Sequence, residues 1–388
     1  MKQLIKREFF CVGENQTIYT KEFVEKSSRE AGNMPALIIS HGFGGNGDDN
    51  EAYGEHFAKL GYAVYSFDFC GGRGDGVKRS SGDSMDLTIA SECEDLTVVL
   101  KQVKELPYIN SQRISLMGMS MGGFVSGLVA AKCKDEIENI ILIYPAICIP
   151  DDARRGCLAG TVYDVNCVPD VIECSGQMRI GRIFHEQIKD MDPYLELCKY
   201  KGRVLIVQGL QDSLVNYSYA IRAKECYEPG QCQLHIIRNA GHWLDAEQTE
   251  SVKVAIEHFL EHKKEQLRIE VFVTEYKVLE ETKYYKKAAV YFTGYCDCEN
   301  FRGSILPGAV DVQEQHQNQE LSLRADYTLE GIDSENRKCK IHILNQKKGK
   351  YFKPEIYTDS PKLAYLQEMD LTASLEGFHG GLTVRIFG

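Results

Sequence analysis

A serine between small residues stands out as a candidate nucleophile. Ser120 lies in the segment Gly118-Met-Ser-Met-Gly122, which fits the pattern Gly-x-Ser-x-Gly. An apolar run at residues 113–117 precedes it and a stretch with helical spacing follows it, so the serine is expected on a sharp turn between a strand and a helix. The flanking positions must be small, because a Cβ atom there would collide with neighbouring backbone. The alternative interpretation is a Gly-Ser turn that only caps the helix.

Two residues further along the chain are candidate partners for this serine. A serine hydroxyl becomes a good nucleophile only when a base takes its proton. Asp212 and His242 each follow an apolar, strand-like run, and the carboxyl ends of parallel strands are where such a sheet places its ligands. We predict that His242 is the general base and then the general acid, and that Asp212 holds its tautomer and stabilises the imidazolium. Alone, each could be a surface histidine or a helix N-cap. Their order after Ser120 favours a triad, and Asp245 is a weaker alternative for the acid.

The oxyanion formed during acyl transfer needs hydrogen-bond donors that are already in place. The segment His41-Gly-Phe-Gly-Gly45 follows a strand-like run at residues 36–40. We predict the backbone N–H groups of Phe43 and Met121 as the donors, the latter at the start of the helix behind the nucleophile. We expect His41 to hold the turn rather than to act as the base.

Short apolar runs alternate with stretches of helical spacing from residue 1 to about residue 263, within a predicted domain of residues 1–266. The predicted strands are residues 36–40, 63–69, 113–117, 140–144, 204–207 and 234–237. The predicted helices are residues 51–60, 89–106, 122–131, 217–227 and 247–262. This alternation is typical of a mostly parallel sheet with helices on both faces, and residues 6–12 and 17–24 predict an antiparallel hairpin at its edge.

One stretch interrupts this alternation. Residues 148–192 contain prolines, several glycines and little periodicity. An insertion of this length in a compact domain is usually functional, so we interpret it as a lid. The alternative is an insertion without a functional role.

The pattern of predicted secondary structure changes after the last predicted helix. Residues 267–388 contain successive strand-like runs with turn signals and no convincing helix, which predicts an all-β, barrel-like domain joined at about residue 266. The predicted strands are residues 268–276, 288–296, 321–329, 340–344, 371–375 and 382–387.

Composition disfavours several classes of protein. The net charge of −11 argues against binding to nucleic acid through phosphates. No apolar stretch has the length of a signal-peptide core or a membrane span, and most of the 14 cysteines are scattered as buried, reduced thiols would be. We therefore expect a soluble cytoplasmic protein without a membrane partner. The group Cys157, Cys167 and Cys174 and the pair Cys296 and Cys298 lack zinc-site spacing, so no metal or organic cofactor is expected.

The motifs as a set resemble those of bacterial cinnamoyl and feruloyl esterases of the α/β-hydrolase superfamily, over about residues 1–263. The resemblance is carried by His41-Gly-Phe-Gly-Gly, Phe67-Asp-Phe-Cys-Gly-Gly, Gly118-Met-Ser-Met-Gly-Gly, Gln208-Gly-Leu-Gln-Asp and Ala240-Gly-His. It implies an esterase whose inserted lid forms part of the pocket for an aromatic acyl group. The family usually has histidine and glutamine on either side of the nucleophile, where this chain has Met119 and Met121. The donor at Met121 is backbone, so the chemistry is unaffected, whereas specificity for hydroxycinnamates does not carry over residue by residue.

The predicted all-β domain, over about residues 268–388, resembles a small bacterial β-barrel family of unknown function. The matching segments are Phe301-Arg-Gly-Ser-Ile-Leu-Pro-Gly-Ala, Leu323-Arg-Ala-Asp-Tyr-Thr-Leu and Val384-Arg-Ile-Phe. This supports the all-β prediction and leaves open whether the domain binds a ligand, shapes the entrance to the esterase or forms a homo-oligomer contact.

Together these observations predict a serine carboxylesterase that hydrolyses small to medium acyl esters through an acyl-enzyme on Ser120, with hydroxycinnamoyl esters as one possible class. An acyltransferase, thioesterase or amidase would use the same triad. A non-catalytic ligand-binding protein is the alternative from another class, and the intact set Ser120, Asp212 and His242 argues against it.

Overall fold

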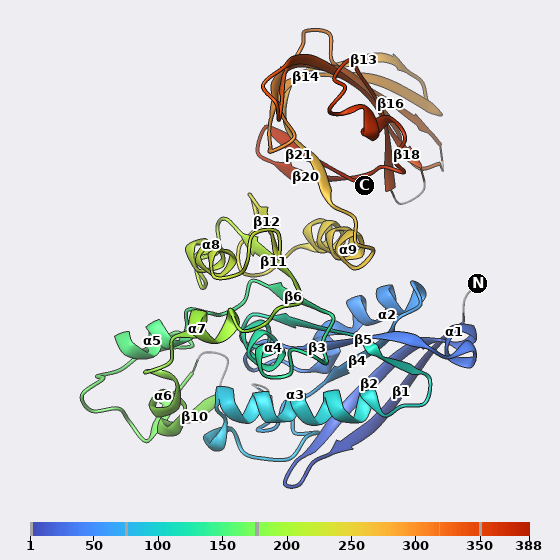
Figure 1. The fold of residues 1–388 in the computed structure, drawn as a ribbon. Coiled ribbons are helices and arrows are strands. Elements are labelled where there is room, and N and C mark those ends of the chain that lie inside the picture. Colours follow the sequence, from blue (N-terminus) through green and yellow to red (C-terminus); the bar gives the residue numbers. More distant parts are fainter. Residues whose placement is uncertain (1–2, 74–76, 175–177, 318, 349–350) are drawn as a thin grey trace. The chain divides into compact units, whose positions relative to one another are not determined.

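The computed structural model describes residues 3–73, 77–174, 178–317, 319–348 and 351–388 (Figure 1). The chain divides into two compact units, Met1–Trp243 and Leu244–Gly388. Each unit is described separately below.

The first unit is built on an eight-stranded sheet whose order along the sheet is β1-β2-β4-β3-β5-β6-β11-β12. The strands are β1 (Leu4–Val12), β2 (Thr17–Glu25), β4 (Ala63–Phe67), β3 (Met34–Ser40), β5 (Ile109–Met119), β6 (Asn139–Ile143), β11 (Arg203–Gly209) and β12 (Cys232–Ile237). β1 and β2 form the predicted antiparallel hairpin at the edge, and the strands from β4 to β12 pair in parallel. The predicted mostly parallel sheet is confirmed.

Helices cover both faces of this sheet, with α3 and α4 on one face and α2 on the other (Figure 1). They are α1 (Lys26–Ala31), α2 (Glu51–Lys59), α3 (Ile89–Lys104), α4 (Met121–Lys132) and α8 (Tyr217–Glu225), with short 3-10 turns η1 (Gly47–Asn50) and η2 (Ser84–Asp86). Strands enclosed in this way are apolar on both sides, and every residue of β6 is buried. The core therefore lies on both faces of the sheet and holds the strand ends in fixed positions.

The insertion at residues 148–192 is more ordered than its sequence suggests. It contains α5 (Ile149–Arg155), β7 (Cys157–Leu158), β8 (Thr161–Val162), β9 (Val171–Glu173), β10 (Arg179–Gly181) and α6 (Arg182–Ile188), and α7 (Pro193–Leu197) follows it. Residues 175–177 of the predicted lid lie outside the described residues. Ile172, Ile180 and Phe184 are buried in the main core. Strands of two or three residues are too short to show a periodic sequence pattern, and packing against the core holds this segment in place.

The second unit starts at Leu244 and its first element is α9 (Ala246–Leu260), which precedes the predicted junction at residue 266. His258 of this helix lies 2.8 Å from the hydroxyl of Thr372 through Nε2, and its ring lies 4.3 Å from that of Phe387, centre to centre. An amphipathic pattern predicts a helix but does not say which core the helix joins, and these contacts place α9 with the β strands.

The β strands of the second unit close into an antiparallel ring, as Figure 1 shows. They are β13 (Glu265–Glu281), β14 (Tyr285–Asp297), β15 (Phe301–Ile305), β16 (Val310–His316), β17 (Ser322–Asp333), β18 (Lys338–Lys348), β19 (Tyr351–Thr358), β20 (Thr372–Phe378) and β21 (Gly381–Phe387). The ring closes because β13 pairs with both β21 and β14. The all-β prediction is confirmed, although β15, β16 and β19 were not predicted. No helix among the described residues is long and apolar enough to cross a membrane.

Candidate active site

Ser120 occupies a strained turn between β5 and α4. Its φ is +51°, in the left-handed region that residues with a side chain rarely adopt. The backbone holds it there: its N–H donates to Ile143 O at 2.9 Å, and its carbonyl accepts from the N–H of Ala146 at 2.9 Å. This is the geometry predicted for the turn, in which strain lifts the hydroxyl clear of the sheet.

The glycines on either side of Ser120 are required by close backbone approach. A Cβ atom on Gly122 would overlap the carbonyl oxygens of Ser40 and His41, and one on Gly118 would overlap the carbonyl of Gly122. The small residues in the motif therefore allow α4 to start directly against the end of β3.

The structure brings Ser120, His242 and Asp212 into one hydrogen-bonded series. His242 Nε2 lies 3.0 Å from Ser120 Oγ, and His242 Nδ1 lies 2.8 Å from Asp212 Oδ2. The side chains of His242 and Asp212 are almost entirely buried, each residue being 6% exposed, while Ser120 is half-buried. The three residues come from the ends of β5, β11 and β12, as the sequence predicted.

Asp212 is held ionised by the groups around it. Burial raises the pKa of its carboxyl, but hydrogen bonds from His242 and from the N–H groups of Val215 and Leu214 outweigh burial and leave the pKa below its ordinary value. The two N–H groups lie 2.8 and 2.9 Å from Oδ1. A carboxylate fixed on this side of the ring favours the histidine tautomer with its proton on Nδ1, which leaves Nε2 free to accept a proton.

The roles of three further side chains at this site were not predicted from the sequence. The amide of Gln208 donates to Asp212 Oδ2 at 2.9 Å, and a lone buried amide in an apolar strand was the available signal. The rings of Tyr144 and Trp243 lie 4.7 and 4.9 Å from that of His242, centre to centre. Tyr144 has a φ of +38°, and burial followed by the nearby Asp212 raises its pKa to about 12.

The two predicted oxyanion donors lie beside Ser120. Met121 is the first residue of α4, so its N–H is one of the unpaired donors at a helix start. Gly42, whose peptide carries the Phe43 N–H, approaches so closely that a Cβ on it would lie 3.3 Å from Ser120 Cβ. Within the described residues neither the Phe43 nor the Met121 N–H has a protein partner, which is what an anion-binding pair requires.

His41 fixes the peptide that carries the Phe43 donor. Its Nε2 accepts from the N–H of Phe69 at 3.1 Å, and its Nδ1 lies 2.7 Å from Gly42 O, so the neutral ring carries its proton on Nδ1 and donates it to that carbonyl. Burial lowers the pKa of His41, against the effect of this hydrogen bond. Because C=O and N–H point in opposite directions in a trans peptide, the Phe43 N–H points away from His41. The prediction that His41 holds the turn agrees with these contacts.

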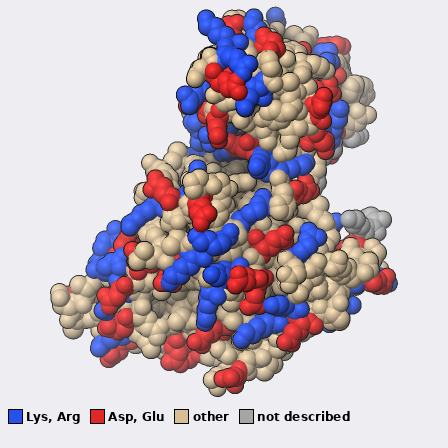
Figure 2. Space-filling model, in the orientation of Figure 1, with Lys and Arg blue, Asp and Glu red and all other residues tan. Residues whose placement is uncertain are grey.

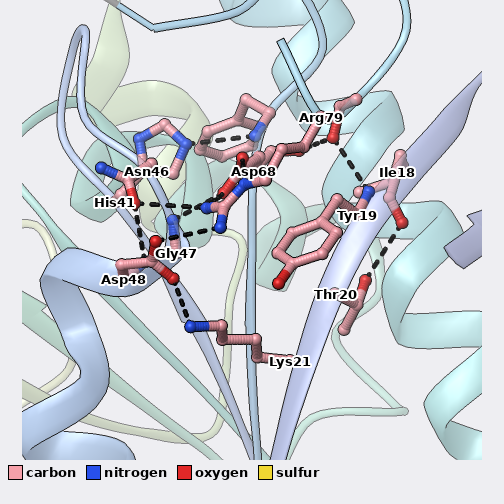
Figure 3. Close-up of polar contacts among 12 residues, drawn as sticks. Ile18, Tyr19, Thr20, Lys21, His41, Asn46, Gly47, Asp48, Asp68 and Arg79 are labelled. Carbon is pink, nitrogen blue, oxygen red and sulfur yellow. Dashed lines mark hydrogen bonds and ion pairs between the residues drawn. The ribbon is translucent and has the colours of Figure 1, made fainter. Parts of the chain in front are cut away.

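A partly buried ion-pair cluster anchors the rest of this loop (Figure 3). Asp68, at the end of β4, accepts from the N–H of Gly47 at 2.8 Å and from Arg79 Nε and Nη2 at 2.6 and 2.7 Å. Arg79 also donates to Asp48 at 2.9 Å and lies over the ring of Tyr19, 4.0 Å from its centre. Through its ion pairs with Asp68 and Asp48 and its stacking on Tyr19, Arg79 connects β4, the loop after β3 and β2.

No group of three or more His, Cys, Asp or Glu side chains among the described residues is placed to hold a metal ion. On the face of the molecule seen in Figure 2, basic and acidic side chains are interspersed over both units. The polar series of Ser120, His242 and Asp212 and the two backbone donors have the arrangement that acyl transfer needs.

Comparison with known proteins agrees with the geometry. Residues 33–163 match the family described as serine aminopeptidase, S33, and residues 99–264 match the family described as BAAT / acyl-CoA thioester hydrolase C terminal. No curated protein matches the chain. Among solved structures, Est1E from Butyrivibrio proteoclasticus with bound ferulic acid is 26% identical, with a TM-score of 0.60 over 66% of this chain and 98% of that one. The α/β hydrolase domain-containing protein 10 from mouse, 17% identical with a TM-score of 0.51 over 66% of this chain and 99% of that one, shares the fold.

Proposed function

This chain is an α/β-hydrolase with an additional C-terminal β domain, and on that premise we propose that it is a serine carboxylesterase acting on small to medium acyl esters. The observation that carries the proposal is the continuous series Asp212–His242–Ser120 with separations of 2.8 and 3.0 Å. A nucleophile, a base within reach of its proton and a group that orients the base are the parts that acyl transfer needs.

The proposed reaction follows from the positions of these groups. His242 Nε2 takes the proton of Ser120 as Oγ attacks the ester carbonyl, and the N–H groups of Phe43 and Met121 bind the resulting oxyanion. The imidazolium then gives its proton to the departing alcohol, which leaves the acyl group on Ser120. Water repeats the sequence and releases the acid. Asp212 keeps the ring oriented throughout and stabilises its charged form.

We propose hydroxycinnamoyl esters as one class of substrate. The support is the likeness to Est1E, whose solved structure holds ferulic acid. In this chain the insertion begins next to the Asp212 loop: Ala146 and Cys148 pack with Val215, and Tyr219 donates to Asp151 at 2.8 Å. A lid attached there would lie close to the acyl group on Ser120, and we propose that residues 148–192 serve as that lid.

Thioester hydrolysis, or acyl transfer and amide hydrolysis with the same triad, is the second candidate. The observation that favours it is the match of residues 99–264 to an acyl-CoA thioester hydrolase family, with a serine aminopeptidase family matching residues 33–163. We also propose that the protein is cytoplasmic. Its proposed partner is a small-molecule ester, not a nucleic acid or a membrane.

The experiment is a substrate panel tested on wild type, Ser120→Ala and the matched control Ser126→Ala, which changes a buried serine in α4, the helix that follows Ser120. The panel contains p-nitrophenyl acetate and butyrate, methyl ferulate, an acyl-CoA thioester and a p-nitroanilide. Turnover of methyl ferulate that Ser120→Ala loses and Ser126→Ala keeps would support both the triad and the aromatic acyl group. Turnover of short esters alone would remove the feruloyl proposal, and turnover of the thioester alone would replace the esterase with a thioesterase. A folded wild type that turns over none of them would overturn the proposed function.

A further inference from the structure

Two cysteines of the β domain face each other at the end of β14. The sulfur atoms of Cys296 and Cys298 lie 3.5 Å apart, and each also lies 3.5 Å from the carbonyl oxygen of Phe301. Cys296 lies on β14, and Cys298 lies in the bend at residues 298–300 that connects β14 to β15. All 14 cysteines are free thiols, and among these described positions no other two sulfurs are hydrogen-bonded to one another.

The two thiols differ in exposure and in acidity. Cys296 is buried, whereas Cys298 is only partly buried. The hydrogen bond from Cys296 is the largest cause that lowers the pKa of the Cys298 thiol, with smaller contributions from the backbone of Phe301, Arg268 and Asn300, against burial, which raises it. The same hydrogen bond, followed by burial, raises the pKa of Cys296. The less buried cysteine is therefore the one whose thiol ionises more readily, as the attacking thiol in a thiol–disulfide exchange must.

The surroundings of the inner thiol contain a polar group without a partner. Tyr327 is 3% exposed, and its hydroxyl has no hydrogen-bond partner within the described residues. Burial, followed by the neighbouring Cys296, raises the pKa of this phenol. Tyr327 and Cys296 belong to the same buried cluster of the β domain, so the surroundings of the inner thiol include an O–H donor without a partner in the described part of the chain.

We propose that Cys296 and Cys298 form a thiol–disulfide exchange site that reacts with low-molecular-weight disulfides. This inference is independent of the proposed esterase activity, because every residue that it uses lies in the second unit. For a cytoplasmic protein it matches the usual role of disulfides in that compartment, which are transient rather than structural.

The reaction balances in two steps. The Cys298 thiolate attacks one sulfur of a disulfide RS–SR, the S–S bond breaks, and RS⁻ leaves and takes up a proton. This forms a mixed disulfide between Cys298 and R. Cys296 then loses its proton and attacks the sulfur of Cys298, which releases the second RSH and forms the Cys296–Cys298 disulfide. The two thiols give up two electrons and RS–SR is reduced to two thiols. The sulfurs need to approach from 3.5 Å to about 2 Å.

The test uses the full chain with glutathione disulfide as the probe and mass spectrometry of the peptides as the readout. In wild type we expect the peptide with both cysteines to lose two hydrogen atoms. Cys296→Ser should stop at a mixed disulfide on Cys298, and Cys298→Ser should lose the reaction. Cys339→Ser, which removes another buried thiol of the same domain, should behave like wild type. Mixed disulfides spread over several cysteines in wild type, or no difference between the Cys298→Ser and Cys339→Ser proteins, would overturn the proposal.

A second measurement keeps the proposal falsifiable if a serine variant folds poorly. The rate of alkylation of Cys298 by iodoacetamide is followed against pH in wild type and in Cys296→Ala. We expect a wild-type midpoint well below the ordinary thiol value of 9.0, and a higher midpoint in the alanine variant because the hydrogen bond from Cys296 is lost. Equal midpoints in the two proteins would contradict the assigned pair.

Discussion

Replacement of Asp212 by asparagine changes one atom in the centre of a crowded site. Asp212 Oδ1 accepts from the N–H groups of Leu214 and Val215, and Oδ2 accepts from His242 Nδ1 and from the amide of Gln208. All four separations are 2.8 or 2.9 Å. An asparagine side chain has one acceptor oxygen and one NH₂ donor group. In the variant the NH₂ group must therefore replace either Oδ1 or Oδ2 and face groups that are themselves donors.

The less costly arrangement of the asparagine inactivates the base. If the NH₂ group faced the two backbone amides, two buried N–H groups would lose their acceptor, at about 1–3 kcal/mol each. If it faces His242, the ring must accept at Nδ1 and carry its proton on Nε2. Nε2 lies 3.0 Å from Ser120 Oγ, and in that tautomer it cannot take the serine proton. We expect kcat to fall about 10⁴-fold, which is a loss of about 5 kcal/mol of transition-state stabilisation.

The assay is steady-state hydrolysis of p-nitrophenyl butyrate by variants whose folding is checked by thermal melts. The matched control is Asp245→Asn. Asp245 caps α9 by accepting from the N–H of Gln248 at 2.8 Å, and asparagine caps a helix about as well as aspartate, so this variant should keep wild-type activity. Equal losses in the two variants, or an Asp212→Asn enzyme within about tenfold of wild type, would refute the assignment of Asp212 as the orienting acid.

Three other predictions follow from the surrounding structure. His41→Ala removes a hydrogen bond to the Gly42 carbonyl, which the Gly45 N–H still holds at 3.1 Å, so kcat should fall measurably but by less than the roughly 10²–10³ of a lost oxyanion donor; an unchanged kcat, or a fall as large as that of a lost donor, would contradict this. Gly122→Ala should abolish soluble folded protein because its Cβ would overlap backbone, whereas Gly241→Ala, with open space around the added atom, should melt like wild type. Burial raises the pKa of Asp95 from 3.8 to about 6, so folded protein holds this proton more tightly than the unfolded chain, and stability present below about pH 4 should be lost as pH rises through 6. In denaturant titrations, the free energy of unfolding of wild type should fall by up to about 3 kcal/mol over this pH range because of Asp95. Asp95→Asn should not show this fall, and the same pH dependence in both proteins would contradict the assignment.

The parts of the site that lie at the ends of apolar strands could be predicted from the sequence. The second half of β5 and the strands β6 and β11 are mainly apolar runs because both faces are covered there. Ser120 and Asp212 follow two of these runs, so their placement at one edge of the sheet needed only the rule for parallel strands. Tyr144 could not be found in the same way, because its approach to His242 depends on a left-handed residue at the end of β6 and on the position of β12.

The differences in the β domain also have physical causes. β16 has the sequence Val-Asp-Val-Gln-Glu-Gln-His, with six of its seven residues partly buried, so it shows no clear contrast between an apolar and a polar face. β19 contains Pro354, and a proline normally argues against a strand that pairs on both sides. The compact unit that contains the β strands also includes α9, whereas we predicted the junction at residue 266. The apolar face of a helix predicts packing but not the partner, and α9 contacts Thr372 and Phe387.

Labelling with a fluorophosphonate probe tests the central claim most directly, because the probe reacts with a serine only when a base has activated it. Wild type, Ser120→Ala and Asp212→Asn would be treated in parallel, and the adduct located by peptide mass spectrometry. We predict a single adduct on Ser120 in wild type, none in Ser120→Ala and a much slower reaction in Asp212→Asn. An adduct on another residue, or a folded wild-type protein that does not react, would contradict the account of Ser120, His242 and Asp212 as a working catalytic triad.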